Sequence, residues 1–597
     1  MTSASQAYDG QRMDEAAARE TRALGSLLLI LNVAAVALKI FLVFRLNVNW
    51  DEFFYLAHVH SYDRGEVLPI MQTFHVHLFY WLTLLPHHEM GQLTAARLVM
   101  AALSIASAVL LYSILRLYFS RMAALATLFL YLAFSDVLDH GTSFRADPMC
   151  AFLFLGALYV YLTAEDRKWP HLLAGALMGL ALMISIKSAL FGIFWAVLLG
   201  ADLMRRPKAA ARQAGLILAG FLIGFGVLYA YHDVTIAAAA QRAAAQNGVA
   251  LGQGGGDSLG VLASVGRKVI SQAGFFPRFP SFLQSLLANP IAWLLVLAGG
   301  TLALVRLRGG RSANAEILAL AGVAMLGTLL FYRNAFAYFY VFLMPAGLFA
   351  AAYAWEELFG QVRRVEEGSL NWARIAAWSF VLIVVGSAAV YLGKYWEDRR
   401  IAQSEIIALV HELFPEPVLY IDRNSMVSSF PKVGFFMSSW GIEGYRARGL
   451  PIMRDILESR EPKFLIANRR LLWLGHEQEE AEGLLRDYLL LDDDFRTLRE
   501  NFIHHWGALY VAGKRLQPDD AGKAWFEILI TGPYSLESES SVYLDGRPVE
   551  PGAVVRLAAG QYRLEAPLGS GEILLRYGDH LPKPDHAPAP QPIYAGL

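Results

Sequence analysis

Eleven apolar blocks, separated by short charged segments, occupy the chain between about residues 25 and 395. They cover residues 27–43, 99–115, 123–134, 149–162, 172–186, 189–203, 214–231, 291–305, 317–332, 335–353 and 375–391. Several are shorter than the roughly 20 residues that cross a membrane, so their helices must extend into flanking residues. Backbone groups in hydrocarbon have to be bonded within the chain, which favours helices. The pattern therefore predicts about eleven membrane-spanning helices.

Beyond about residue 396 the pattern becomes that of a water-exposed protein. Short apolar runs at 418–421, 464–466 and 508–511 indicate buried strands, and 452–459 and 477–490 indicate helices between them. This alternation predicts a small α/β domain.

From about residue 520 apolar and polar residues alternate, with turn signals between the runs. Residues 541–544 precede Asp545-Gly546, and residues 554–557 precede Ala559-Gly560. We expect a small β-sandwich-like module here, ending in a disordered Pro-rich tail. The predicted organisation is a tail (1–24), a transmembrane domain (25–395), an extracytoplasmic α/β domain (396–515) and the β module (516–597).

Composition supports a membrane protein and excludes several other classes. The 597 residues are 56% hydrophobic and only 17% charged, which is too apolar for a soluble protein. The net charge is −1 and no basic stripe is present, so we expect no nucleic-acid partner. The lone Cys150 excludes an intrachain disulfide and a cysteine zinc site. Arg45-Leu46-Asn47 follows the first block in place of a small-residue cleavage site, so that block is not a signal peptide.

Basic residues are concentrated in every second loop, and this alternation predicts the orientation of the chain in the membrane. The N-terminal tail and every second loop are basic: Arg12/Arg19/Arg22, Arg116/Arg121, Arg167-Lys168, Arg205-Arg206-Lys208, Arg306/Arg308/Arg311 and Arg363-Arg364. Basic loops stay in the cytoplasm, which puts the N-terminus inside and the C-terminal domain outside. The long loops 46–96 and 232–285 then face out. The second contains a glycine patch at 252–256 that reads as a flexible connection.

Two adjacent acids open the first outer loop. Asp51 and Glu52 stand among large aromatic residues, including Tyr55. They would be solvated acids in an interfacial aromatic belt, or carboxylates in a half-dry cleft that accept a proton from a hydroxyl. The same loop closes with His75 and His77. Residues at i and i+2 point the same way on a strand but lie about 200° apart on a helix, so the pair could bind a metal only in extended structure. The loop's other histidines, 58, 60, 87 and 88, read as solvated.

Three basic residues break the orientation rule, because they stand at the outer ends of helices. They are Arg145, Lys187 and Arg333. Buried basic residues near a membrane surface need anionic partners. Asp147 would be an internal partner, and the alternative is an anionic headgroup or lipid phosphate.

The order of these features resembles the GT-C superfamily of membrane glycosyltransferases, in the branch of the protein O-mannosyltransferases and the lipid A aminoarabinose transferase. The matching residues, all on one predicted membrane side, are Asp51-Glu52, the element at 75–81, Arg145-Ala146-Asp147, Lys187, and Arg333 followed by Tyr338, Tyr340 and Pro345. The resemblance covers about residues 25–395, and the segment to about 515 is similar in style. His77 departs from the pattern, since the family usually has proline there.

The resemblance implies an inverting glycosyltransferase in the bacterial inner membrane. It would move a sugar from a polyprenyl-phosphate carrier to a lipid, polysaccharide or protein acceptor on the outer face. Asp51 would be the general base and Glu52 would orient the acceptor or a metal. Arg145, Lys187 and Arg333 would bind the donor phosphate, and Asp147, Tyr55, His75 and Tyr338 the substrates. Metal use varies in the family, which leaves a divalent ion (Mg²⁺, Mn²⁺ or Zn²⁺) open, with His75 and His77 as its candidate ligands.

Two other classes compete with the enzyme. A transporter or lipid flippase usually places polar residues mid-span and has internal repeats. Here the charged candidates cluster at one membrane face, and no repeat is found. A membrane scaffold that only presents the C-terminal domains would leave the one-sided group of acids and bases unexplained. The sequence names neither the sugar nor the acceptor.

Overall fold

The computed structural model describes residues 2–68, 70–86, 88–165, 167–247, 274–309, 314–364, 372–393, 400–475, 489–589 and 593–594. The glycine patch at 252–256, His87 and nearly all of the predicted helix at 477–490 lie outside the described residues. The chain divides into two compact units. The first, here the helical unit, comprises Met1–Leu46, Tyr62–Leu82 and Thr94–Asp398. The second, here the C-terminal unit, comprises Asn47–Ser61, Thr83–Leu93 and Arg399–Leu597.

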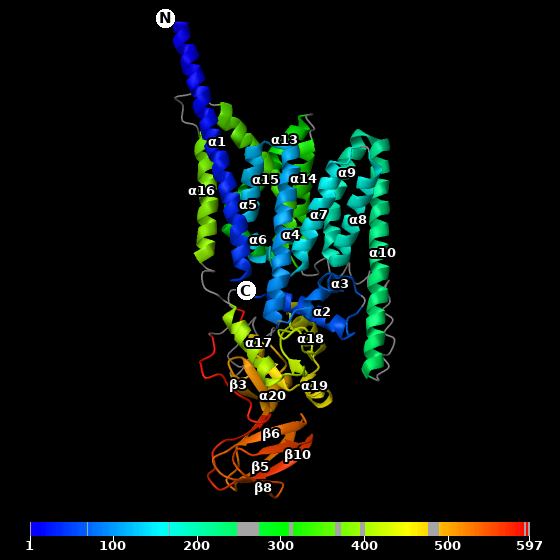
Figure 1. The fold of residues 1–597 in the computed structure, drawn as a ribbon, viewed down its shortest axis with the longest axis vertical. Coiled ribbons are helices and arrows are strands. Elements are labelled where there is room, and N and C mark those ends of the chain that lie inside the picture. The colour runs from blue at the N-terminus through cyan, green and yellow to red at the C-terminus, as the bar shows by residue number, and fades with distance from the viewer. Residues whose placement is uncertain are drawn as a thin grey trace. The chain divides into compact units, whose positions relative to one another are not determined.

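Helices make up the helical unit, and its long helices run roughly parallel to one another (Figure 1). They are α1 (Thr2–Val43), α4 (Glu89–Tyr118), α5 (Arg121–Leu132), α6 (Ser135–His140), α7 (Ala146–Leu162), α8 (Lys168–Ile184), α9 (Phe191–Arg205), α10 (Pro207–Asn247), α12 (Phe279–Ala288), α13 (Pro290–Arg308), α14 (Asn314–Leu326), α15 (Phe339–Arg364) and α16 (Trp372–Gly393). Shorter turns of helix are η1 (Met71–Thr73), α3 (His75–Phe79), η2 (Tyr80–Leu84), η3 (Ile186–Leu190) and η4 (Gly327–Leu330).

Six described helices are long and apolar enough to cross a membrane. They include Arg22–Val43, Glu89–Tyr118, Ile186–Arg205, Pro207–Ala245, Pro290–Arg308 and Phe339–Gln361. The shorter apolar helices are α5, α7, α8, α12, α14 together with η4, and most of α16. Each predicted apolar block falls largely within one of these helices. The predicted polytopic helical membrane fold with a C-terminal β-sheet region is confirmed.

Helix α15 forms the centre of the helical unit. It contacts α5, α7, α13, α14 and α16, and its apolar stretch is almost completely buried. This follows from its sequence, which is apolar around the whole circumference. Small residues on its neighbours allow the backbones to approach. A Cβ on Gly299 of α13 would lie 1.8 Å from the Ala350 carbonyl oxygen of α15, and one on Gly322 of α14 would lie 2.2 Å from that of Ala346.

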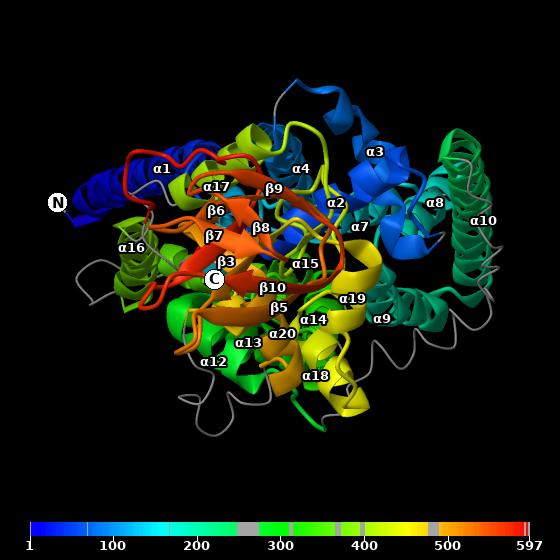
Figure 2. The same cartoon turned by 90° about the horizontal axis from the view of Figure 1, so that it is seen from below.

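Helices α8 and α10 pack through glycines in the same way. A Cβ on Gly175 would lie 2.0 Å from the Ile217 carbonyl oxygen, and one on Gly220 would lie 2.0 Å from the Leu172 carbonyl oxygen. Figure 2, which looks along the helices, shows the two side by side at one edge of the helical unit. Small residues spaced along facing helices give membrane helices close van der Waals contact.

The C-terminal unit combines helices with two β-sheets. Its helices are α2 (Trp50–Asp63), α17 (Ile401–Leu413), α18 (Ser439–Arg448), α19 (Met453–Arg460), η5 (Arg470–Leu472) and α20 (Asp492–Asn501). Its strands are β1 (Tyr420–Ile421), β2 (Phe464–Ile466), β3 (Phe502–Trp506), β4 (Leu509–Leu516), β5 (Lys523–Ile528), β6 (Gly532–Glu537), β7 (Val542–Leu544), β8 (Arg547–Val549), β9 (Val554–Leu557), β10 (Gly560–Glu565) and β11 (Ile573–Tyr577).

One sheet runs through both predicted C-terminal domains. Its order is β1-β2-β4-β11-β6-β9, with β3 also paired to β4, and the β4–β11 pair (Leu516 opposite Ile573) joins its two halves. The second sheet, β5-β10-β7-β8, packs against it through a common core that includes Phe526, Leu536, Leu564 and Leu575. The predicted turn at Asp545-Gly546 connects β7 to β8, and both residues have positive φ, as tight hairpins require.

One segment differs from the sequence prediction. The first outer loop is largely helical, since α2, η1, α3 and η2 fill residues 50–63 and 71–84.

The described part of the Pro-rich tail contacts the strand β3, and the predicted disorder of the tail stays a prediction. His505 Nε2 lies 2.9 Å from the Pro582 carbonyl oxygen and Trp506 Nε1 donates to the His586 carbonyl at 3.2 Å, while Tyr594 is buried. Backbone contacts with aromatic and histidine side chains, which a composition argument does not consider, link these residues to β3.

Candidate functional site

The turns at one end of α7 and α8 bring opposite charges together. Arg145 has extended backbone just before α7, and Asp147 lies in the first turn of that helix. Lys187 lies in η3, the short turn between α8 and α9. Tyr338 immediately precedes α15. We call Arg145, Asp147, Lys187 and Tyr338 the cation cluster.

The cation cluster holds two cations and one carboxylate almost out of solvent. Lys187 Nζ is paired with Asp147 Oδ1, and Arg145 Nε lies 3.4 Å from Asp147 Oδ2. Residues 145, 147 and 187 are 4%, 1% and 7% exposed. The Arg145 guanidinium carbon lies 3.7 Å from the centre of the Tyr338 ring, a cation–π distance. The cluster therefore brings two cations to one carboxylate in a nearly dry site, an arrangement that could also receive an anionic ligand.

The other candidates in the helical unit are His75, His77 and Arg333. His75 is fully buried, with Nδ1 3.0 Å from the Gln72 carbonyl oxygen and its ring edge against Phe144. His77 Nε2 lies 2.7 Å from His232 Nδ1 of α10. The two imidazoles, both in helix α3, therefore have different partners. Arg333 is half-buried between η4 and α15, and its carbonyl accepts a hydrogen bond from Arg278 Nε at 3.0 Å.

The two adjacent acids belong to the C-terminal unit, where they have different roles. The Asn49 side chain accepts from the Asp51 N–H at 2.9 Å, and Glu52 Oε1 accepts from the Asn49 N–H at 2.9 Å. This reciprocal pair is a capping box that starts α2. Glu52 is fully buried, whereas Asp51 and Tyr55 are half-buried. The helix therefore uses Glu52 as a cap and presents Asp51 in its first turn.

Residues far along the sequence surround Asp51 in the same unit. The Arg423 guanidinium stacks on the Trp50 ring, with 3.8 Å from its carbon to the ring centre. The Asn424 side chain donates to the Trp50 carbonyl, and the Tyr594 hydroxyl donates to Asn424 Oδ1 at 3.2 Å. Burial lowers the pKa of Arg423, opposed by Tyr594 and by the nearby carboxylates of Asp51 and Asp422.

Sequence reasoning missed Arg423 and Tyr594. Neither belongs to a motif, and Tyr594 follows the Pro-rich stretch. The capping box was readable, since Asn49 and Glu52 have the required spacing before the buried Phe53 and Leu56.

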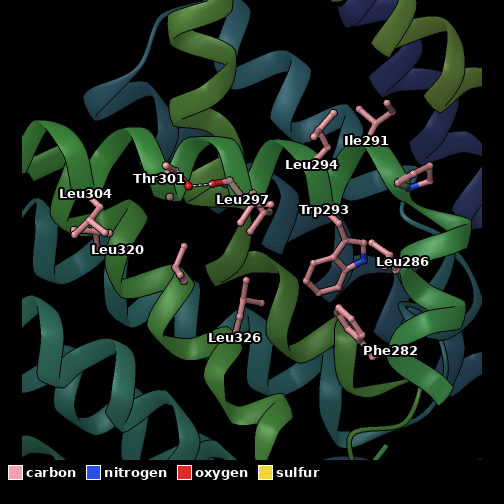
Figure 3. Close-up of a pocket in the computed structure, with 14 residues that line it drawn as sticks. Phe282, Leu286, Ile291, Trp293, Leu294, Leu297, Thr301, Leu304, Leu320 and Leu326 are labelled. Atoms are coloured by element: carbon pink, nitrogen blue, oxygen red, sulfur yellow. Dashed lines mark hydrogen bonds between the residues drawn. The ribbon is translucent and has the colours of Figure 1, made fainter. Parts of the chain in front are cut away.

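An apolar pocket of about 770 Å³ lies along α13 and α14. Figure 3 shows Phe282 and Trp293 at one end and Leu304 with Leu320 towards the other. The hydroxyl of Thr301 donates to the Leu297 carbonyl at 2.8 Å. The lining is therefore almost entirely apolar, and it suits a hydrocarbon better than a polar ligand.

Comparison with known proteins finds one family model that matches part of the chain. Residues 69–230 match the family model described as dolichyl-phosphate-mannose-protein mannosyltransferase. That segment contains Arg145, Asp147 and Lys187 and begins after Asp51. No curated protein matches the chain.

The fold is similar to that of several solved membrane proteins. The chain is similar to apo oligosaccharyltransferase of Archaeoglobus fulgidus, with a TM-score of 0.56 and 14% identity over 89% of this chain and 74% of that one. The same archaeal enzyme, AglB, in complex with an inhibitory peptide and a dolichol-phosphate, has a TM-score of 0.51 and 13% identity, with the same coverage. ArnT from Cupriavidus metallidurans, bound to undecaprenyl phosphate, has a TM-score of 0.49 and 17% identity over 73% of this chain and 92% of that one.

These identities are low, so the likeness to AglB concerns the fold, and the family match concerns residues 69–230. Both agree with the resemblance that the order of Asp51-Glu52, Arg145-Ala146-Asp147 and Lys187 predicted. The described part of the chain has a polytopic helical membrane fold similar to that of AglB, and residues 69–230 are similar to the dolichyl-phosphate-mannose-protein mannosyltransferase family.

Proposed function

We propose that the protein is an inverting glycosyltransferase that takes a sugar from a polyprenyl-phosphate carrier and transfers it to a hydroxyl of a lipid, glycan or protein. The observation that carries the proposal is the cation cluster, where Arg145 and Lys187 both pair with Asp147 almost out of solvent. Two cations held together at the end of a membrane helix suit a lipid phosphate that stays at the membrane surface.

The reaction needs little acid catalysis. The acceptor oxygen forms a bond to the anomeric carbon as the bond from that carbon to the phosphate oxygen breaks. The bonding electrons leave with the polyprenyl phosphate, whose negative charge increases. In the proposal Arg145 and Lys187 stabilise that charge, with Arg333 as a further donor. Asp147 keeps the two cations in place, and Tyr338 holds the Arg145 guanidinium through its ring face.

Asp51 is the proposed base that takes the acceptor's hydroxyl proton. It is half-buried at the start of α2, and the capping box fixes the helix that presents it. Tyr55 lies one turn further along α2 and His75 begins α3, and the proposal assigns both to substrate binding. Glu52, the second proposed catalytic acid, would act by holding this turn.

The proposal places the reaction on the outer face of a bacterial inner membrane, with the N-terminus in the cytoplasm and the C-terminal unit outside. Its partners are the bilayer, a polyprenyl-phosphate-linked sugar and the acceptor. Dolichol-phosphate and undecaprenyl phosphate in the solved complexes of AglB and ArnT are carriers of this class.

The first experiment identifies the product. The masses of surface lipids, glycans and glycoproteins are compared between cells with and without the protein. A mass increment of one sugar that depends on the protein supports the proposal. Surface molecules that remain identical, together with solute flux by the purified protein in liposomes, would instead indicate a transporter.

The second experiment separates the base from the phosphate site. Asp51→Asn should reduce single-turnover transfer by about 10²–10⁴-fold, because general-base catalysis contributes that much, and should leave undecaprenyl phosphate binding in detergent nearly unchanged. Arg145→Ala should weaken both, and Arg145→Lys should restore them only partly, since lysine lacks the guanidinium fork.

Matched controls are available in the chain. Asp63→Asn changes another acid of α2, and Arg167→Ala removes an arginine whose side chain is 66% exposed. Both should bind and transfer like wild type. If Asp51→Asn abolished phosphate binding while Arg145→Ala left it intact, the two assignments would be reversed, and a metal held by Asp51 would explain the result better.

A further inference from the structure

Three side chains with metal-binding atoms meet in the C-terminal unit, among residues that the proposed reaction does not use. They are His88, Glu89 and His411, and their candidate ligand atoms all lie within 4.8 Å of one another. His88 and Glu89 stand at the start of α4, and His411 is in the last turn of α17. More than 300 residues separate the two segments.

The distance between the ligand atoms of Glu89 and His411 is close to that in a zinc site. His411 Nε2 lies 2.9 Å from Glu89 Oε2. Two ligand atoms on a tetrahedral zinc, each about 2.0–2.2 Å from the ion, lie roughly 3.3 Å apart. The imidazoles of His88 and His411 are stacked with ring centres 3.9 Å apart. A ring nitrogen of the exposed His88 lies within 4.8 Å of the ligand atoms of Glu89 and His411.

The carboxylate is already oriented by groups behind it. Glu89 is 1% exposed, and its other oxygen, Oε1, accepts from the Ser429 backbone N–H at 3.0 Å and from the Ser429 hydroxyl at 2.5 Å. This leaves Oε2 directed at His411. Hydrogen bonds of this kind fix the ligands of metal sites. The Phe430 ring packs edge-on against His411 and limits its rotation.

We propose that His88, Glu89 and His411 bind a zinc ion that ties the end of α17 to the start of α4. Two imidazoles and one carboxylate are ligands that Zn²⁺ accepts, whereas Mg²⁺ and Ca²⁺ prefer oxygen atoms. Since His88 faces solvent, a water molecule completes the tetrahedron. The site is separate from the two histidines, His75 and His77, that the sequence suggested.

The test uses the full chain in detergent, purified without a histidine tag. The protein is stripped with a chelator, and bound zinc is counted by mass spectrometry after titration with Zn²⁺ alone. Wild type should bind one equivalent, and its melting temperature should rise on reloading. His88→Ala and His411→Ala should each lose this equivalent. Ser429→Ala, which keeps all three ligands, should raise the Kd for zinc by about 10–100-fold.

The control is His580→Gln, which removes an exposed histidine of the same unit and should bind zinc like wild type. His88→Ala removes an exposed side chain and should fold, which size-exclusion chromatography checks. The proposal is overturned if wild type binds no zinc. It is also overturned if zinc binds equally to His88→Ala and His411→Ala, because the ion would then be adventitious and Glu89 and His411 would form only an ion pair.

Discussion

Asp51 and Glu52 are neighbours in the sequence but have different physical surroundings. Glu52 is fully buried and bonded to the backbone of Asn49, which commits it to starting helix α2. Asp51 is half-buried, near the guanidinium of Arg423. A carboxylate that accepts a proton has to reach the acceptor, so Asp51 fits the proposed role of base better than Glu52 does.

Glu52→Ala should lower the stability of the protein by about 0.5–2 kcal/mol, because the cap of α2 is lost. Glu52→Gln should restore it, since glutamine also completes a capping box. Thermal unfolding in detergent and sugar transfer, measured on both variants, distinguish the roles. If Glu52→Gln melted like wild type but transferred as poorly as Asp51→Asn, Glu52 would take part in the chemistry.

Protonation of a single residue, His505 of β3, should make the stability of the protein depend on pH. Burial, more than the nearby positive charges of Arg576 and Lys583, lowers the pKa of His505 from 6.5 to about 4. The unfolded chain binds a proton at higher pH than the folded one. The stability contributed by neutral His505 is therefore complete above pH 6.5 and falls as the pH drops towards 4.

His505→Gln should flatten this fall, because glutamine can donate to the Pro582 carbonyl and does not titrate. Melting temperatures between pH 7.5 and 4.5 are compared with those of wild type and of His580→Gln, an exposed histidine of the same unit. An unchanged slope in His505→Gln would show that other groups cause the acid sensitivity.

Sequence reasoning found the residues of the cation cluster because charges at helix ends in an apolar segment are conspicuous. It did not find Arg423, Tyr594 or the Glu89–His411 pair. These are ordinary residues in polar segments, and only contacts over several hundred residues give them significance. Such contacts leave no local pattern in a single sequence.

At the scale of helices, the contact between α8 and α10 depends on the absence of side chains. Gly220→Leu should destabilise the protein by about 1–3 kcal/mol or more, because its Cβ would meet the Leu172 backbone. Gly226→Leu in the same helix is the matched control, since nothing lies within 4 Å of its Cβ position. Equal melting temperatures for the two variants would contradict close packing of α8 on α10.

Most helices could be predicted, because apolar blocks of this length have few alternatives in a membrane. Helix α2 was missed, because its apolar residues are interrupted by acids and histidines. The strands β2 and β9 matched their predicted ranges, but the pairing of β4 with β11 was not predictable. An alternating pattern identifies a strand and not its partner.

At the scale of the whole molecule, the proposed orientation can be tested with cysteines. Cys150 is buried and should give little background. Ser538→Cys, after β6, should react with an impermeant reagent added to intact cells with a permeable outer membrane. Ser312→Cys should not, because its basic loop is proposed to be cytoplasmic. Ser312 lies outside the described residues. Reaction at position 312 from outside would reverse the orientation.

The C-terminal unit consists of three separate pieces of chain, and this has a consequence for synthesis. Its first two pieces, Asn47–Ser61 and Thr83–Leu93, are translated before the intervening residues 94–398. At about 5–20 residues per second, that interval lasts on the order of 15–60 s. During this time the apolar residues Phe53, Leu56 and Val59 of α2, which are buried in the folded chain, cannot yet pack against the third piece. We expect α2 to be a binding site for folding factors on the ribosome-bound chain, and that binding should end only as the third piece folds.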